Sequence, residues 1–423
     1  MSFEYCKTSG YGNEMSDFGI VWSDGKGRCI FGVADGYSGE LGKKVSSLLT
    51  QFVASSIEDE KEKITVETVV TWISSLFDRA EEYLSDEIIQ YFEKNQFETK
   101  SNRVNDENII YFRDTKSPMF VDRHVWQPID SGCSFTMVVI IDDHIFTANV
   151  GHCGAILFSD KECFEEHDVG MLFDAAMKDI YTFRGEYGFK KTRNLILTCN
   201  QSPTSWYEYC RIKGSPKGSS LQFVYDIHPS YVQNYLPIFP EDISKKPKKQ
   251  NYGHYYKNVE KEFGAVVMNS VGPKRLLNTT RGFLNNDLKP FGVTHKPAIT
   301  LTKLKEDSNV TLFIGTNGVF DNWIRTYERA EEIGTDKKYV LPEFFSDPSM
   351  TLANFMDQNL EQNKINFKDN YDEACGILVR LNSKTSIPST TPLTFKAMHI
   401  SQICSSSSTS NVLFKGSIVN CCA

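Results

Sequence analysis

Three residues with side-chain oxygens stand at the ends of apolar runs that are typical of buried strands. These are Asp35 after residues 29–34, Asn317 after residues 309–315, and Asp372 before residues 376–381. Oxygen atoms of carboxylates, amides and backbone carbonyls are the ligands that hard divalent cations prefer. Such residues also hold turns through hydrogen bonds, so their chemical types alone leave metal binding and turn formation both open.

The elements that position these residues follow from the spacing of apolar side chains. Apolar residues recur at helical spacing from Glu40 to about Ser56, and again from about Val66 to Phe92. Short runs rich in Val, Ile and Phe predict strands at 18–22, 29–34, 135–141, 144–150, from 154, at 195–198, 309–315 and 376–381. The strands come in clusters with tight turns and the helices come in pairs. This order predicts an α+β layered fold rather than a doubly wound parallel sheet.

The predicted domain spans residues 1–383 and contains two segments without period, which we interpret as insertions near 94–128 and 213–262. From Thr385 onward the chain is rich in Ser and Thr. Such composition is typical of a mostly disordered tail, which we place at 384–423.

Composition excludes several classes of protein. The net charge of −8 gives no basic surplus for a nucleic-acid binder. No apolar run is long enough to span a membrane, and the first residues lack a signal-peptide pattern, so we expect a cytoplasmic or nuclear protein. The 11 cysteines are scattered, which favours reduced thiols over a disulfide framework. We also expect a monomer.

Several segments resemble, in the same order, the type-2C (PPM-type, metal-dependent) protein phosphatase family. Residues 31–39 read F-G-V-A-D-G-Y-S-G where the family reads F-G-V-F-D-G-H-G-G. Residues 312–321 read L-F-I-G-T-N-G-V-F-D where it reads L-I-L-A-S-D-G-L-W-D. Further matches lie at 131–134, 145–155, 197–203 with Glu208 and Arg211, 280–283 with Lys289, and 372–379.

The resemblance implies two packed antiparallel sheets flanked by pairs of helices. It also implies hydrolysis of phosphoserine and phosphothreonine with two Mn²⁺ or Mg²⁺ ions, which activate a shared water. Carried over position by position, it makes Asp35 the bridging metal ligand, Gly36 a carbonyl ligand and Asp372 the last metal ligand. Asp17 would contact the metal ions through a water molecule, or would support the residues that bind them.

Four roles depart from the family pattern. Asn317 replaces a metal aspartate and loses its full charge, and His152 replaces the aspartate of a third metal site. Tyr37 occupies the position of the general acid, although the reference pKa of tyrosine is about 10. No Arg or Lys lies between Lys7 and Lys26, so the phosphate clamp is missing.

For several single residues, a purely structural role is an alternative to a role in the site. Glu14 is a weak substitute for a lost acid, and His152 fits a turn better than a metal site. Arg281 and Lys289 are better explained as structural than as phosphate-binding residues, which leaves no predicted phosphate-binding residue.

Two functions therefore remain open. The first is a pseudophosphatase that regulates or scaffolds phosphorylation signalling through a protein partner, such as a kinase or a phosphoprotein, and needs no metal. The second is an active, divergent protein serine/threonine phosphatase that uses Mn²⁺ or Mg²⁺ at a weakened site.

Overall fold

The fold comes from a computed structural model of the whole chain. The residues that it describes are 1–10, 15–25, 27–104, 107–114, 126–159, 161–164, 169–177, 179–181, 193–215, 218–225, 237–239, 264–268, 276–304, 309–325, 330–331, 334, 336, 339–345, 349–368, 371–381, 395–399 and 411–417.

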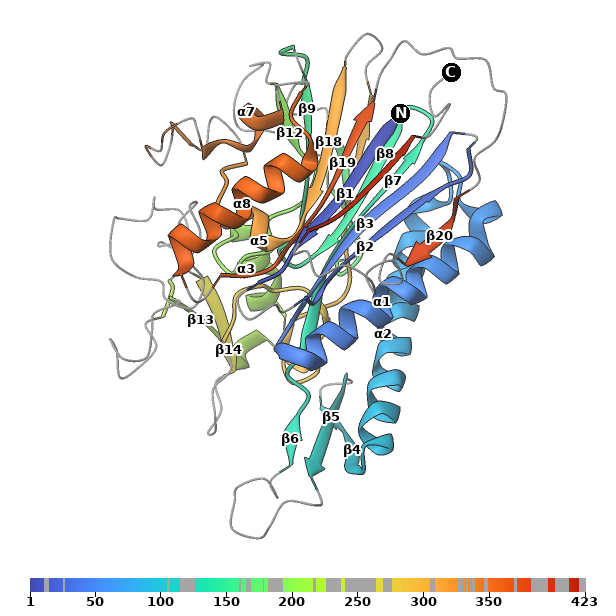
Figure 1. Cartoon of the computed structure of the whole chain (residues 1–423). Helices are drawn as coiled ribbons and strands as arrows, with labels where there is room; N and C mark the ends of the chain where they lie inside the picture. Colours follow the sequence, from blue (N-terminus) through green and yellow to red (C-terminus); the bar gives the residue numbers. More distant parts are fainter. Residues whose placement is uncertain are drawn as a thin grey trace.

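Two antiparallel sheets form the centre of the molecule (Figure 1). The first sheet has the order β12 (Asn194–Ile196), β9 (Gly154–Ser159), β18 (Val310–Gly315), β19 (Ala374–Leu381), β1 (Ser2–Thr8) and β21 (Asn411–Ser417). The second has the order β11 (Asp179–Tyr181), β10 (Val169–Asp174), β17 (Ala298–Lys303), β8 (His144–Val150), β7 (Gly132–Ile141), β3 (Arg28–Tyr37), β2 (Asp17–Ser23) and β20 (Phe395–His399), with β16 (Phe283–Leu284) on β7.

The central strands are apolar along their whole length because both of their faces are buried. In β3, Phe31 and Val33 pack in the cluster between the two sheets, whereas Ile30 and Ala34 pack in the cluster under the helices. Successive side chains of a strand point to opposite faces, so burial on both sides needs an unbroken apolar run.

Helices cover the outer face of each sheet (Figure 1). The pair α1 (Gly39–Glu60) and α2 (Val69–Lys94) covers the second sheet, and α5 (Asn317–Phe320), α7 (Leu341–Phe345) and α8 (Leu352–Phe367) cover the first. This helix–sheet–sheet–helix arrangement confirms the predicted α+β fold of two antiparallel sheets flanked by helices.

The segment predicted to be an irregular insertion at 94–128 contains regular structure. It forms the small sheet of β4 (Phe97–Val104), β5 (Glu107–Asp114) and β6 (Gln127–Pro128). Phe112 stacks on Phe92 at the end of α2 with ring centroids 4.5 Å apart, and Phe97 meets both rings edge-on. This aromatic contact anchors the hairpin, and the polar residues around it hid the strands from a reading of periodicity.

The second predicted insertion, at 213–262, belongs to a larger unit that we call the side lobe. The lobe comprises α3 (Trp206–Lys213), the short helix η5 (Gly218–Ser220), the sheet β13 (Leu221–Tyr225), β14 (Gly264–Met268) and β15 (Leu276–Leu277), and the short helix η6 (Lys289–Phe291). Its apolar side chains form a cluster of their own. Residues 226–236 and 240–263 lie outside the described part of the chain.

Two segments of the predicted tail form strands. Residues 395–399 form β20 on the edge of β2, and residues 411–417 form β21 on the edge of β1. These two segments pair with sheet edges, whose free backbone groups offer partners that composition does not reveal, and the mostly disordered tail at 384–423 stays a prediction. The rest of 384–423 lies outside the described residues.

Two expectations about the whole chain can be compared with the described residues. None of their helices combines the length and the apolar character that crossing a membrane requires. The described cysteines are free thiols.

A further short helix, η2 (Lys61–Lys63), joins α1 to the loop before α2.

Candidate metal and phosphate site

Two of the predicted site residues meet on neighbouring strands of the second sheet. Asp17 at the start of β2 lies directly opposite Asp35 near the end of β3. Asp35 in turn lies opposite Ser134 of β7. Both carboxylates are almost fully buried, with 1% of Asp17 and 6% of Asp35 exposed. A tight hairpin joins β2 to β3, and its register brings together two acids that are 18 positions apart in the sequence.

The other half of the site lies where β18 ends and β19 begins. Gly315 and Gly376 are register partners, so Thr316 and Asn317 lie close to Asp372 and Glu373. A Cβ on Gly318 would lie 1.8 Å from the backbone oxygen of Glu373, so this close approach requires glycine.

A threonine connects the two halves. The Thr316 Oγ1 hydroxyl donates to Asp17 Oδ2 at 2.6 Å and accepts from the backbone N–H of Cys375 at 2.9 Å. One hydroxyl thus ties the end of β18 to both sheets, and it supports the charged form of Asp17.

The site concentrates negative charge. Burial raises the pKa of Asp17 well above its ordinary value, and the nearby carboxylates of Glu373 and Asp35 raise it further. Burial also raises the pKa of Asp35, and Asp372 and Glu373 add to the effect. Desolvation and like charge both disfavour the ionised form, so these acids tend to retain protons unless a cation balances them.

The acids at the start of β19 are bound by internal hydrogen bonds. The Asn317 Nδ2 amide donates to Asp372 Oδ2 at 3.1 Å, and the backbone N–H of Glu373 donates to Asp372 Oδ1 at 3.0 Å. The Glu373 carboxylate accepts from the backbone N–H and the hydroxyl of Ser16, and from the N–H of Asp17 at 3.1 Å. Both oxygens of Asp372 and of Glu373 are therefore engaged within the chain.

We tested whether these residues fit the two-ion centre that the family resemblance implies. Asp17 Oδ1 and Asn317 Oδ1 are buried oxygens with no hydrogen-bond partner among the described residues, and both could accept a cation. The Asn317 amide, however, points its N–H₂ group at Asp372, the carboxylate that would share the ion. No group of three His, Cys, Asp or Glu side chains in the described part of the chain is arranged to hold a metal. With its N–H₂ group facing Asp372, the Asn317 amide does not fit a two-ion centre, because both residues would have to offer oxygen atoms to the ions.

Tyr37, predicted at the general-acid position, lies at the end of β3 and packs against the apolar cluster of the side lobe. Its hydroxyl oxygen accepts a hydrogen bond of 2.6 Å from Asn285 Nδ2. Sequence reasoning did not single out Asn285, and the family match at 280–283 ended two residues before it.

His152 lies in the turn between β8 and β9. Burial, assisted by the charge of Arg325, lowers its pKa to about 3, so the imidazole is neutral near pH 7. Its backbone N–H donates to Ser134 Oγ at 3.2 Å. This contact agrees with the interpretation of His152 as a turn residue rather than a metal ligand. Glu14 and the rest of 11–14 lie outside the described residues.

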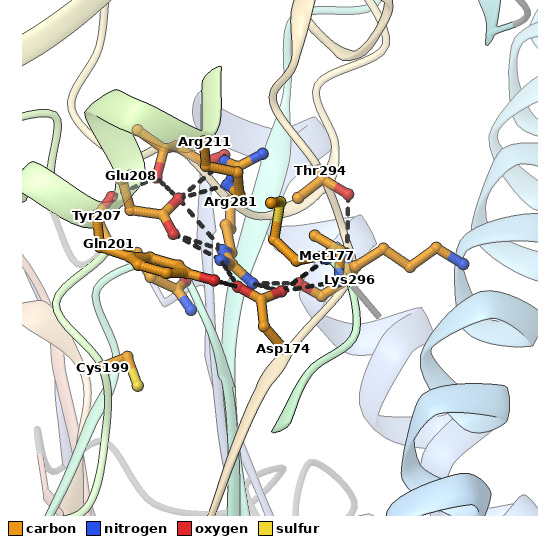
Figure 2. Close-up of polar contacts among 12 residues, drawn as sticks. Asp174, Met177, Cys199, Gln201, Tyr207, Glu208, Arg211, Arg281, Thr294 and Lys296 are labelled. Atoms are coloured by element: carbon orange, nitrogen blue, oxygen red, sulfur yellow. Dashed lines mark hydrogen bonds and ion pairs between the residues drawn. The ribbon is translucent and has the colours of Figure 1, made fainter. Parts of the chain in front are cut away.

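Arg281 is committed to a buried ion network (Figure 2). Its Nη2 lies 2.7 Å from Asp174 Oδ2 and its Nε lies 3.1 Å from Glu208 Oε1. Arg211 Nη2 also binds Glu208, at 2.8 Å, and the Tyr207 hydroxyl donates to Asp174 Oδ2 at 2.6 Å. These contacts give Arg281 a structural role, and nothing in the sequence around Asp174 indicated its part in the network.

Lys289 is also engaged inside the protein, because it is 6% exposed and forms an ion pair with Glu81 of α2. Neither basic residue of this segment is therefore available to a phosphate group. Among the described residues, those singled out from the sequence supply no phosphate clamp.

A comparison with family models matches one part of the chain. Residues 38–169, from the turn before α1 to the first residue of β10, match the protein phosphatase 2C model. This part of the chain is therefore similar to protein phosphatase 2C. A comparison with curated proteins found no match.

Several solved structures are similar to this chain over most of its length at low sequence identity. A serine-threonine phosphatase 2C from Toxoplasma gondii is 12% identical, with 90% of this chain and 95% of that chain covered and a TM-score of 0.49. The serine/threonine phosphatase Stp1 from Staphylococcus aureus is 12% identical, with 90% and 96% covered and a TM-score of 0.44. A C. elegans sex determining protein is 11% identical, with 90% and 64% covered and a TM-score of 0.44.

Proposed function

We propose that this protein is a catalytically impaired member of the phosphatase 2C family, a pseudophosphatase that acts as a regulatory or scaffold protein in phosphorylation signalling. The observation that carries the proposal is the hydrogen bond from Asn317 Nδ2 to Asp372 Oδ2. In the phosphatase 2C pattern, residues at these two positions would instead bind the metal ions.

Charge explains why this bond matters. An asparagine in place of an aspartate removes one negative charge, and its N–H₂ group would face a cation held by Asp372 with the positive end of a dipole. Two divalent ions a few Å apart repel one another, so their site needs several carboxylates. Tyr37 and the missing arginine weaken the site in two further roles, proton donation and phosphate binding.

The alternative is an active, divergent Mn²⁺- or Mg²⁺-dependent protein serine/threonine phosphatase. Its support is the effect of Asp372, whose charge raises the pKa values of both Asp17 and Asp35 and therefore lies near that pair. Such a group offers negative charge to a single ion, which can still lower the pKa of a bound water.

Two measurements on the purified full chain separate these functions. Calorimetric titration with Mn²⁺ should show no binding, and a phosphoserine peptide and an aryl phosphate should show no turnover with Mn²⁺ or Mg²⁺. The Asn317→Asp variant should gain Mn²⁺ binding, because it restores a carboxylate at the position where the amide now donates to Asp372.

The decisive control is Asp35→Ala beside Asp86→Ala, since Asp86 is exposed on α2. Turnover by the natural chain that Asp35→Ala abolishes and Asp86→Ala retains would refute the pseudophosphatase and support the active enzyme.

The remaining expectations are proposals of the same kind. We propose a protein partner, a kinase or a phosphoprotein, and a monomer that binds no nucleic acid. Light scattering tests the monomer, and imaging of a tagged chain tests the expected cytoplasmic or nuclear location.

A further inference from the structure

Tyr37, at the end of β3, makes an apolar contact between the central sheets and the side lobe. Its half-buried ring packs against the hydrophobic cluster of the lobe. Among the described residues of that cluster, Tyr37 is the one contributed by a central strand, and the others lie between 209 and 293. The residue that follows Asp35 and Gly36 is thus part of the lobe's core.

The ring fits because two neighbouring positions lack side chains. Tyr37 lies opposite Gly132 of β7, and Gly132 lies opposite Leu284 of β16. A Cβ on Gly132 would lie 2.5 Å from the Tyr37 hydroxyl oxygen, and a Cβ on Gly282 would lie 2.8 Å from it. Glycine at these two positions leaves the space through which the phenol reaches past β7 toward β16.

A strained turn presents the partner of the hydroxyl. Leu284 and Asn285 have φ angles of 56° and 55°, a left-handed conformation that is costly for leucine. The Leu284 N–H donates to Glu81 Oε2 at 2.9 Å and the Asn285 N–H donates to the Ser131 oxygen at 3.2 Å, so the turn is fixed from two sides. In this conformation the fully buried Asn285 reaches Tyr37.

We propose that Tyr37 and Asn285 form a lock that fastens the side lobe to the central sheets beside the Asp35–Gly36 corner. The Arg281 network attaches the start of α3 to β10, whereas the lock secures the apolar side of the lobe. Tyr37 is thus a positioning residue for the lobe. This inference goes beyond the loss of hydrolysis and does not depend on it.

Amide hydrogen exchange followed by mass spectrometry tests the lock, because it reports opening of the lobe separately from global unfolding. Tyr37→Ala should raise exchange at least about tenfold in peptides covering 206–225 and 264–268, because burial of an aromatic ring dominates local packing. Peptides covering 132–150 of the central sheet should keep their protection. Tyr83→Ala is the matched control, since Tyr83 of α2 is also half-buried and stacks on Phe52 away from the lobe.

Two milder variants isolate the hydrogen bond and guard against a Tyr37→Ala chain that does not fold. Tyr37→Phe and Asn285→Ala should each raise exchange in the lobe by about 2- to 10-fold, as expected for one lost hydrogen bond. Asn285→Ala also removes the hydrogen bond of 3.2 Å from Asn285 Nδ2 to the Phe283 oxygen. The double variant should therefore not exceed Asn285→Ala, since that change already removes the bond to Tyr37.

Several results would overturn the lock. These are unchanged lobe exchange in Tyr37→Ala, an equal rise in the central sheet, the same lobe response in Tyr83→Ala, or fully additive effects of Tyr37→Phe and Asn285→Ala.

Discussion

Replacing Glu208 with glutamine removes a carboxylate that binds both Arg211 and Arg281. Arg281 has none of its surface exposed and Glu208 has 1%. The substitution keeps the shape of the side chain, but it leaves the Arg281 guanidinium with Asp174 as its remaining carboxylate partner. Breaking a buried ion pair by neutralising one partner costs about 3–5 kcal/mol, because the other charge stays buried. We therefore expect Glu208→Gln to lower the free energy of unfolding by about 3 kcal/mol.

Urea denaturation monitored by tryptophan fluorescence measures this loss. Glu361→Gln is the matched control, because Glu361 forms an ion pair with Lys364 on the surface of α8 and such pairs contribute about 0–1 kcal/mol. A loss below about 1 kcal/mol for Glu208→Gln, equal to that of the control, would refute the argument that the network stabilises the fold. Replacing Asp174, Glu208, Arg211 and Arg281 together with Leu, Leu, Met and Met should cost less than Glu208→Gln alone, since no charged member of the network is then left without its partner.

Two further predictions follow from the same structure. Burial would by itself raise the pKa of Glu208, but the charges of Arg211 and Arg281 hold that pKa well below its ordinary value. The charge of Arg281 likewise lowers the pKa of Asp174. A carboxylate with a lowered pKa in the folded state stabilises the protein above its unfolded pKa, here about 4, and this stability is lost as the pH falls further. The difference in unfolding free energy between the natural chain and Glu208→Gln should therefore shrink below about pH 4, and a constant difference down to pH 2 would contradict the assignment. Gly318→Ala should cost about 1–3 kcal/mol in the same urea assay, because its Cβ would meet the Glu373 backbone at 1.8 Å. Gly376→Ala should lower the free energy of unfolding by less, since its Cβ would meet the Phe313 side chain at 3.2 Å. Equal losses for the two variants would show that the backbone at 315–318 moves readily to accept a Cβ.

The sequence predicted the layered architecture because apolar periodicity is a local property. Both faces of β3 are buried, and the unbroken apolar run 29–34 already predicted burial on both sides. The hairpin at 97–114 escaped prediction because its anchoring contact, Phe112 on Phe92, joins residues in different elements. Two tail segments escaped for a similar reason, since their partners are the edges of β1 and β2.

The candidate site divides in the same way. The amide at Asn317, the phenol at Tyr37 and the absence of a basic residue between Lys7 and Lys26 can be read directly from the chain, because they concern the chemical type at single positions. What these groups touch depends on residues far away. Tyr37 receives its hydrogen bond from a residue 248 positions later, and Ser16 donates to a carboxylate 357 positions later.

The sequence by itself thus determined the order of strands and helices and the positions near Asp35 and Gly36 that depart from the family pattern it resembles. Only the tertiary structure decided that Asn317 satisfies Asp372, that Arg281 is buried between Asp174 and Glu208, and that Tyr37 belongs to the side lobe. The physical reason is that burial and strand register choose partners among distant residues, and neither is encoded within the few residues that make up a motif.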